Sequence, residues 1–103
     1  MLRLRKLMIQ PYKWFGMASD SEKRKVWERG KPIKGKNPST HRKDAMGNEI
    51  YWASYGKNSP MGWEIDHKNP KDNGGSESIK NKQPLQTKAN REKSNKYPYK
   101  KKR

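Results

Sequence analysis

The chain has 103 residues, of which 28% are hydrophobic and none is cysteine. This length indicates one domain with a small core, and the lack of cysteine excludes disulfides and Cys-ligated zinc as supports for it. The 26 Lys and Arg residues outnumber the 10 Asp and Glu residues and give a net charge of +16, which favours a nucleic-acid partner over a membrane surface.

The N-terminal part of the sequence is strongly basic. Residues 1–18 contain no acid and form a basic arm. An organellar targeting peptide has a similar composition, but a phosphate-binding arm explains it as well. We therefore expect an intracellular protein, in the cytoplasm or nucleoid, or in a host cell if it is viral.

Residues 19–43 predict a short helix followed by a basic linker. An S-x-x-E capping box from Ser19 to Glu22 is typical of a helix start, and Gly30 lies where a C-terminal cap is expected. The residues after it are rich in Gly, Pro and Lys, which favours an extended linker.

Residues 44–96 contain the predicted domain, and its first half reads as β-structure. Gly47-Asn48 is typical of a hairpin turn, and the aromatic and β-branched residues after it favour a strand. A second turn follows at residues 57–62. The alternation in residues 63–67 then predicts a half-buried strand.

A return strand and a helix complete the predicted domain. Residues 71–75 include two glycines and predict a loop. Residues 81–85 predict a short return strand, which Pro84 restricts to the edge of a sheet. Residues 86–96 are compatible with a helix, and the basic tail at residues 97–103 follows it.

Four residues carry the candidate chemistry, namely Asp66, His67, Asn81 and Asn90. Their order is an acid–histidine pair that ends a strand, an asparagine at the return strand and an asparagine on the helix. A strand, a return strand and a helix can fold back so that the strand end faces the first helical turns. We therefore expect the fold to bring Asp66 and Asn90 together.

This set of residues suits hydrolysis of a phosphodiester with one divalent ion. Mg²⁺ or Mn²⁺ takes hard oxygen ligands and acts as a Lewis acid, and the Asp66 carboxylate and Asn90 carbonyl fit that requirement. Histidine gains and loses a proton near neutral pH, so His67 suits deprotonation of water. Its other ring nitrogen requires a partner, for which Asn81 or a backbone carbonyl is available.

The segment GWEIDHKNPKDNGGSESIKNKQPLQTKANREK resembles the HNH endonucleases of the ββα-metal (His-Me finger) superfamily. Their usual run is an Asp-His pair, a Pro, a Gly-Gly-Ser loop, Asn-x-Gln-Pro-Leu, and an Asn or His on a helix that ends in Lys. The resemblance extends upstream through RKDAMGNEIYWASYGKNSPMGW and covers about residues 42–93.

The resemblance implies a role for each of the four residues. Asp66 would ligate the metal, and His67 would be the general base. Asn81 would brace the loop and orient the histidine. Asn90, at a position where many members have His, would be the second metal ligand and would make this chain an HNN variant.

The sequence departs from the family pattern at two points. Lys82 stands where members often carry a Leu that anchors the return strand. The paired cysteines that often bind a structural zinc are absent, so we expect no structural zinc.

Other side chains are candidates for substrate contact or for packing. Glu64 lies on the Asp66 side of its strand, where it could bind a second ion or pair with Lys or Arg. Trp52, Tyr55 and Trp63 are expected to form core rather than to stack on bases. Basic residues of the helix and tail are candidate phosphate contacts, with a solvated helix face as the alternative; they are Lys88, Arg91, Lys93, Lys100, Lys101, Lys102 and Arg103.

We therefore expect a single α+β domain, in which a small ββα-metal (HNH) motif at residues 62–95 follows an N-terminal helix and hairpin and carries basic extensions. The expected activity is metal-dependent nicking or weakly specific cleavage of double-stranded DNA, by a monomer or a dimer. The alternative is a non-catalytic basic nucleic-acid-binding protein, histone-like or part of a ribonucleoprotein, that retains the HNH fold.

Overall fold

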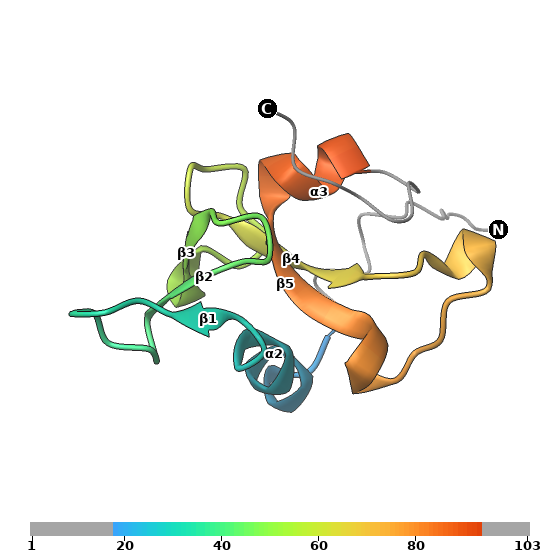
Figure 1. Cartoon of the computed structure of the whole chain (residues 1–103), viewed down its shortest axis with the longest axis horizontal. Helices are drawn as coiled ribbons and strands as arrows, with labels where there is room; N and C mark the ends of the chain where they lie inside the picture. Colours follow the sequence, from blue (N-terminus) through green and yellow to red (C-terminus); the bar gives the residue numbers. More distant parts are fainter. Residues whose placement is uncertain (1–17, 94–103) are drawn as a thin grey trace, which may run out of the picture.

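The structure is a computed structural model that describes residues 18–93. This part of the chain forms two helices, five short strands and three 3-10 turns, so it is a small α+β fold as expected (Figure 1). In chain order the helices and strands are α2 (Asp20–Trp27), β1 (Lys31–Pro32), β2 (His41–Lys43), β3 (Glu49–Tyr51), β4 (Trp63–His67), β5 (Lys82–Gln86) and α3 (Thr87–Lys93). The 3-10 turns are Trp52–Ser54, Lys71–Asn73 and Ile79–Asn81.

Helix α2 begins at the predicted cap. The Ser19 hydroxyl accepts a hydrogen bond from the backbone N–H of Glu22 at 3.0 Å, which satisfies one of the unpaired donors of the first turn. The Glu22 carboxylate contacts Lys82 of β5 instead of returning to the cap. The capping box is therefore half formed, and its acid connects α2 to the second sheet.

Strands β1, β2 and β3 form an antiparallel sheet in that order. The turn between β2 and β3 is the predicted hairpin, with Gly47 at a φ of +88°. The Asp44 carboxylate stabilises this turn by accepting from the backbone N–H groups of Met46 and Asn48. Strands β1 and β2 lie in the segment that we expected to be an extended linker, so that expectation was too simple.

Strands β4 and β5 form a separate antiparallel pair, in which Asp66 lies opposite Gln83 and Ile65 opposite Pro84. Helix α3 follows β5 directly and packs against both strands (Figure 1). The backbone N–H of Thr87 donates to Gly62 O at 2.9 Å, which attaches the start of α3 to the start of β4. These three elements make the expected ββα unit.

The hydrophobic core joins α2 to both sheets. Trp27, Ile50 and Trp63 are fully buried, and the ring centroids of Trp27 and Trp63 lie 5.1 Å apart. Trp52 and Tyr55 pack around them, which confirms that these aromatic residues form core. Since Trp27 comes from α2 and Trp63 from β4, the N-terminal helix is part of the domain. Among residues 18–93 no helix has the length and apolar character that crossing a bilayer requires.

Candidate active site

The Asp66 carboxylate lies on β4 with only 5% of the residue exposed. Its Oδ1 pairs with Lys93 Nζ of α3 at 3.0 Å, and its Oδ2 accepts from Gln83 Nε2 of β5 at 2.9 Å. A buried carboxylate is costly unless charge or hydrogen bonds compensate it, and here both neighbouring elements contribute a partner.

Asn90 faces Glu64 rather than Asp66. Its Nδ2 donates to Glu64 Oε1 at 2.7 Å, so the expected direct approach of Asn90 to Asp66 is not what the contacts show. The difference arises from the way α3 lies along β4. Asn90 is level with Glu64, whereas Lys93, one turn later, is level with Asp66. Asn90 and Asp66 therefore have different partners, although both sets of contacts lie between β4 and the elements packed against it.

Glu64 is fully buried between β4 and α3. Burial raises its pKa, while the hydrogen bond from Asn90 and the charge of Arg91 act in the opposite direction. Its Oε2 has no hydrogen-bond partner among the described residues, and the nearest cation is Arg91 Nη2 at 3.6 Å. Of the two roles expected for Glu64, a second metal site or an ion pair, the structure shows an ion pair with Arg91. Its Oε2 remains without a hydrogen bond among the described residues.

The predicted basic face of α3 is divided by the fold. Lys88 and Arg91 are exposed, as a phosphate-contacting face requires. Lys93 is only 2% exposed, and besides Asp66 it contacts His67, since its Nζ donates to the His67 carbonyl at 2.9 Å. Lys93 therefore has an internal role in place of the exposed position we expected. The tail residues Lys100, Lys101, Lys102 and Arg103 lie outside the described residues.

His67 ends β4 with a quarter of its side chain exposed. Its Nε2 lies 3.2 Å from Glu77 Oε1, a partner that the sequence analysis missed in favour of Asn81 or a backbone carbonyl. The hydrogen bond from Lys71 and, to a smaller extent, the one from His67 lower the pKa of Glu77 to about 2. An ionised carboxylate only accepts hydrogen bonds, so Nε2 carries the hydrogen and the Nδ1 of a neutral ring keeps its lone pair.

Asn81 braces the loop that follows β4. Its Oδ1 accepts from the backbone N–H of Asn69, and its Nδ2 donates to the Asn69 carbonyl at 3.0 Å and to the Ser76 carbonyl at 2.8 Å. Gly75 lies in the same loop, where an added Cβ would be 1.6 Å from the Asn69 carbonyl oxygen. The loop that carries Glu77 is therefore held in one conformation by Asn81 and by close packing.

Lys82, which stands where HNH endonucleases often carry a Leu, anchors the return strand β5 by ionic contacts. It is 6% exposed, and its Nζ contacts Glu22 of α2 and Glu77, the latter at 3.3 Å. The Lys82 carbonyl also accepts from Arg29 Nε at 2.9 Å. An ionic bridge to the N-terminal segment thus takes the place of the Leu that usually anchors this strand. No sequence signal singles out Glu22 and Glu77 as these partners among the 10 acids of the chain.

The donor chemistry of Asp66 and Asn90 fits a hard divalent ion. Because the Nδ2 of Asn90 donates to Glu64, its Oδ1 is the remaining acceptor of the amide. Lys93 Nζ already places one positive charge against Asp66. In the part of the chain that the structure describes, no three His, Asp or Glu side chains are grouped to hold a metal by themselves. A metal here would have two protein oxygens and would take its other ligands from water or substrate.

Comparison with known protein families finds a match in the part of the chain that contains the candidate site. Residues 58–99 match the family model described as HNH endonuclease. No curated protein and no solved structure shows significant similarity to the chain. The matched segment includes β4, β5 and α3, and with them the Asp66–His67 pair and both asparagines. The ββα unit of this chain is therefore similar to the HNH endonuclease family.

Proposed function

We propose that the chain is a metal-dependent endonuclease that hydrolyses phosphodiester bonds in DNA, with His67 as the general base. The observation that carries the proposal is the end of β4. There, a buried Asp66 carboxylate and the partly exposed ring of His67 come from consecutive residues within the segment that matches the HNH family. A carboxylate in that position suits metal ligation, whereas binding of phosphate alone does not require one.

In this proposal Asp66 and Asn90 hold one Mg²⁺ or Mn²⁺ ion. When bound, the ion would supply Lewis-acid stabilisation of the negative charge that develops on the phosphate. The Asn90 amide is oriented by Glu64, which accepts from its Nδ2 and leaves Oδ1 for the ion. An asparagine at this position makes the chain an HNN variant.

His67 removes the proton from the attacking water through Nδ1. Glu77 supports this role, because an acceptor at Nε2 selects the tautomer in which Nδ1 is unprotonated. Asn81 acts on the loop that carries Glu77 and so positions the histidine indirectly. Lys93 holds the His67 carbonyl and the Asp66 carboxylate together, which fixes the end of β4.

Nicking or weakly specific cleavage is the mode of action that we include in the proposal. The net charge of +16 supports nucleic acid as the substrate.

A plasmid-nicking assay tests the proposal, with Mg²⁺ or Mn²⁺ and with EDTA as the metal-free control. Wild-type protein and His41→Ala, which alters the only other histidine, are expected to nick in either metal. His67→Ala is expected to lose most of the rate, by about 10²-fold or more, because general base catalysis contributes at least that much. If folded wild-type protein binds DNA but nicks in neither metal, the non-catalytic binding protein is the correct assignment.

A further inference from the structure

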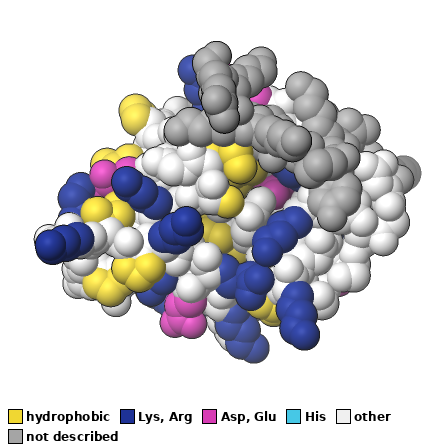
Figure 2. Space-filling model, in the orientation of Figure 1, with side chains coloured by type: hydrophobic (Ala, Val, Ile, Leu, Met, Phe, Trp, Pro, Cys, Tyr) yellow, Lys and Arg dark blue, Asp and Glu magenta, His cyan; other side chains and the backbone are white. Residues whose placement is uncertain are grey.

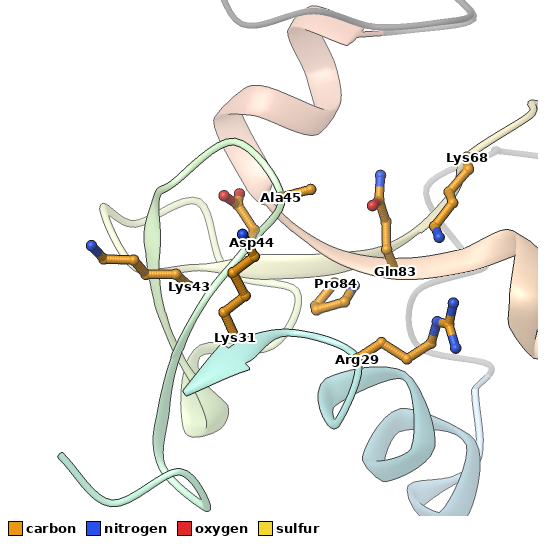
Figure 3. Close-up of a pocket in the computed structure, with 8 residues that line it drawn as sticks. All are labelled: Arg29, Lys31, Lys43, Asp44, Ala45, Lys68, Gln83 and Pro84. Carbon is orange, nitrogen blue, oxygen red and sulfur yellow. The ribbon is translucent and has the colours of Figure 1, made fainter. Parts of the chain in front are cut away.

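A basic pocket of about 160 Å³ lies beside the candidate active site, and most of the cations around it come from outside the segment that matches the HNH family. Figure 3 shows Arg29 after α2, Lys31 on β1 and Lys68 after β4 around Gln83 and Pro84 of β5. Lys43 also contributes to the wall. Lys and Arg side chains gather across the middle of this face of the molecule (Figure 2). We call these four cations and the space between them the cation pocket.

The positive charge of the cation pocket is only partly balanced by the acids whose side chains the structure describes. None of its four cations forms an ion pair with such an acid, although Lys43 lies opposite Glu49 in the β2–β3 pairing. The one acid in the wall, Asp44, is committed to the backbone N–H groups of its own turn and of β5. The pocket therefore presents an excess of positive charge to whatever enters it.

Two of these cations are placed together at a cost. Lys31 and Lys43 lie directly opposite each other in the β1–β2 pairing. Like charges at directly opposed positions destabilise an antiparallel pair. Glu49, which lies opposite Lys43 on β3, offsets part of this repulsion, and an anion bound beside the two lysines would offset more of it. Arg29 uses its Nε for the Lys82 carbonyl, which fixes the side chain and leaves its terminal nitrogens for an anion.

The cation pocket is connected to the candidate metal ligand. Gln83 lines the pocket, and its Nε2 donates to Asp66 Oδ2 at 2.9 Å. Lys68 lies next to His67 in the chain. A strand with one phosphate in the pocket would therefore have its neighbouring phosphates close to Asp66.

We propose that the cation pocket binds a backbone phosphate of the DNA strand that is cut, next to the phosphate that reacts. Arg29, Lys31 and Lys43, which precede the ββα unit in the chain, would thereby set the path of the substrate across that unit. The identification of this DNA as substrate rests on the proposed nuclease function, whereas the binding of a DNA phosphate by the pocket does not. A volume of about 160 Å³ is large enough for a phosphate group.

The first test measures binding of the full chain to a short DNA duplex by fluorescence anisotropy, in EDTA and at several NaCl concentrations. The variant Lys31→Gln/Lys68→Gln is compared with Lys25→Gln/Lys57→Gln, which removes the same charge from two exposed positions outside the pocket. The pocket variant should make the slope of log affinity against log salt less steep by about 0.9, the value for one lost phosphate contact. Equal slopes for the two double variants would overturn the proposal.

The second test maps the contact in the wild-type protein, so no variant has to fold. Lysine reactivity towards reductive methylation is measured by mass spectrometry with and without the duplex. We expect DNA to protect Lys31 and Lys68 more than Lys57, and poly-glutamate to protect them less than DNA does. Equal protection of Lys57 and the pocket lysines would overturn the proposal. Both tests read binding without turnover, so their failure is distinguishable from a failure to nick.

Discussion

The ion pair between Lys93 and Asp66 gives the sharpest prediction about stability. The side chains of Lys93 and Asp66 are 2% and 4% exposed, and the Nζ–Oδ1 distance is 3.0 Å. Replacement of Lys93 by Met keeps much of the volume but removes the charge. Asp66 would then retain Gln83 as its one hydrogen-bond donor among the described side chains, and its negative charge would be uncompensated.

The expected loss in the free energy of unfolding is about 3–5 kcal/mol, the usual effect of removing one partner of a buried pair. Small domains have about 5–15 kcal/mol of stability in total, so Lys93→Met would come close to unfolding the protein. The double variant Lys93→Met/Asp66→Asn removes both charges, and we expect it to lose less than Lys93→Met alone. The difference between the two variants isolates the effect of the unpaired carboxylate.

A divalent ion should partly rescue Lys93→Met. An ion bound at Asp66 would replace the missing positive charge, and at about 100 times its Kd it would stabilise the folded state by about 2.7 kcal/mol. The stabilisation by Mn²⁺ should be greater for Lys93→Met than for wild type, because the ammonium no longer competes for the carboxylate. It should be lost in Lys93→Met/Asp66→Asn.

Urea unfolding followed by tryptophan fluorescence measures these values, since Trp27 and Trp63 are fully buried. Lys88→Met is the matched control, because Lys88 is exposed on the same helix and its replacement should change stability by less than about 0.5 kcal/mol. If Lys93→Met lost no more stability than Lys88→Met, the buried pair would not be the support that we describe.

Four further variants test the loop after β4, all by urea unfolding. Asn81→Ala removes three hydrogen bonds of about 1 kcal/mol each, so a loss of about 3 kcal/mol is expected, and a loss below about 1 kcal/mol would contradict the bracing role. Gly75→Ala should cost about 3 kcal/mol because its Cβ would meet the Asn69 carbonyl at 1.6 Å. Gly74→Ala meets no atom within 4 Å and is disfavoured only by its φ of +86°, so it should cost about 1 kcal/mol. A greater loss of stability for Gly74→Ala than for Gly75→Ala would show that the loop is placed differently. Glu77→Gln should reduce stability by about 1 kcal/mol or less, since the Glu77 side chain is 57% exposed. Because the pKa of Glu77 is lowered from 4.5 to about 2, this difference should be complete above pH 4.5 and vanish as the pH falls towards 2, and a constant difference would exclude an ionised Glu77 as its source.

The local elements of this fold were largely predictable, because each has a short-range signal. The alternation in residues 63–67 predicted β4 with its observed bounds, and the return strand was displaced by one residue. The sheet of β1, β2 and β3 was only partly predicted. Its first pairing involves Lys31 and Pro32 with Arg42 and Lys43, which show no apolar alternation. Arg42 supports it through hydrogen bonds to the Pro38 and Gly30 carbonyls, contacts that no local pattern encodes.

The sequence names candidate residues for the site, but it does not determine which side chains they contact. The position of Asp66 at the end of a strand followed from the pattern of the chain. The partner of Asp66 depends on the offset of α3 along β4, because a difference of one helical turn determines whether Asn90 or Lys93 faces Asp66. Neither helix propensity nor spacing determines that offset. Glu77 was missed for a similar reason, because its approach to His67 depends on the path of a whole loop.

The proposed role of His67 is tested most directly by chemical rescue. The rate of plasmid nicking by His67→Gly is measured in Mg²⁺ with and without added imidazole. A general base can be replaced by a diffusible one, so imidazole should restore part of the lost rate, and it should not do so in EDTA or in Asp66→Asn. Nicking by His67→Gly at the wild-type rate, or a loss that no concentration of imidazole relieves, would contradict the assignment of His67 as the base.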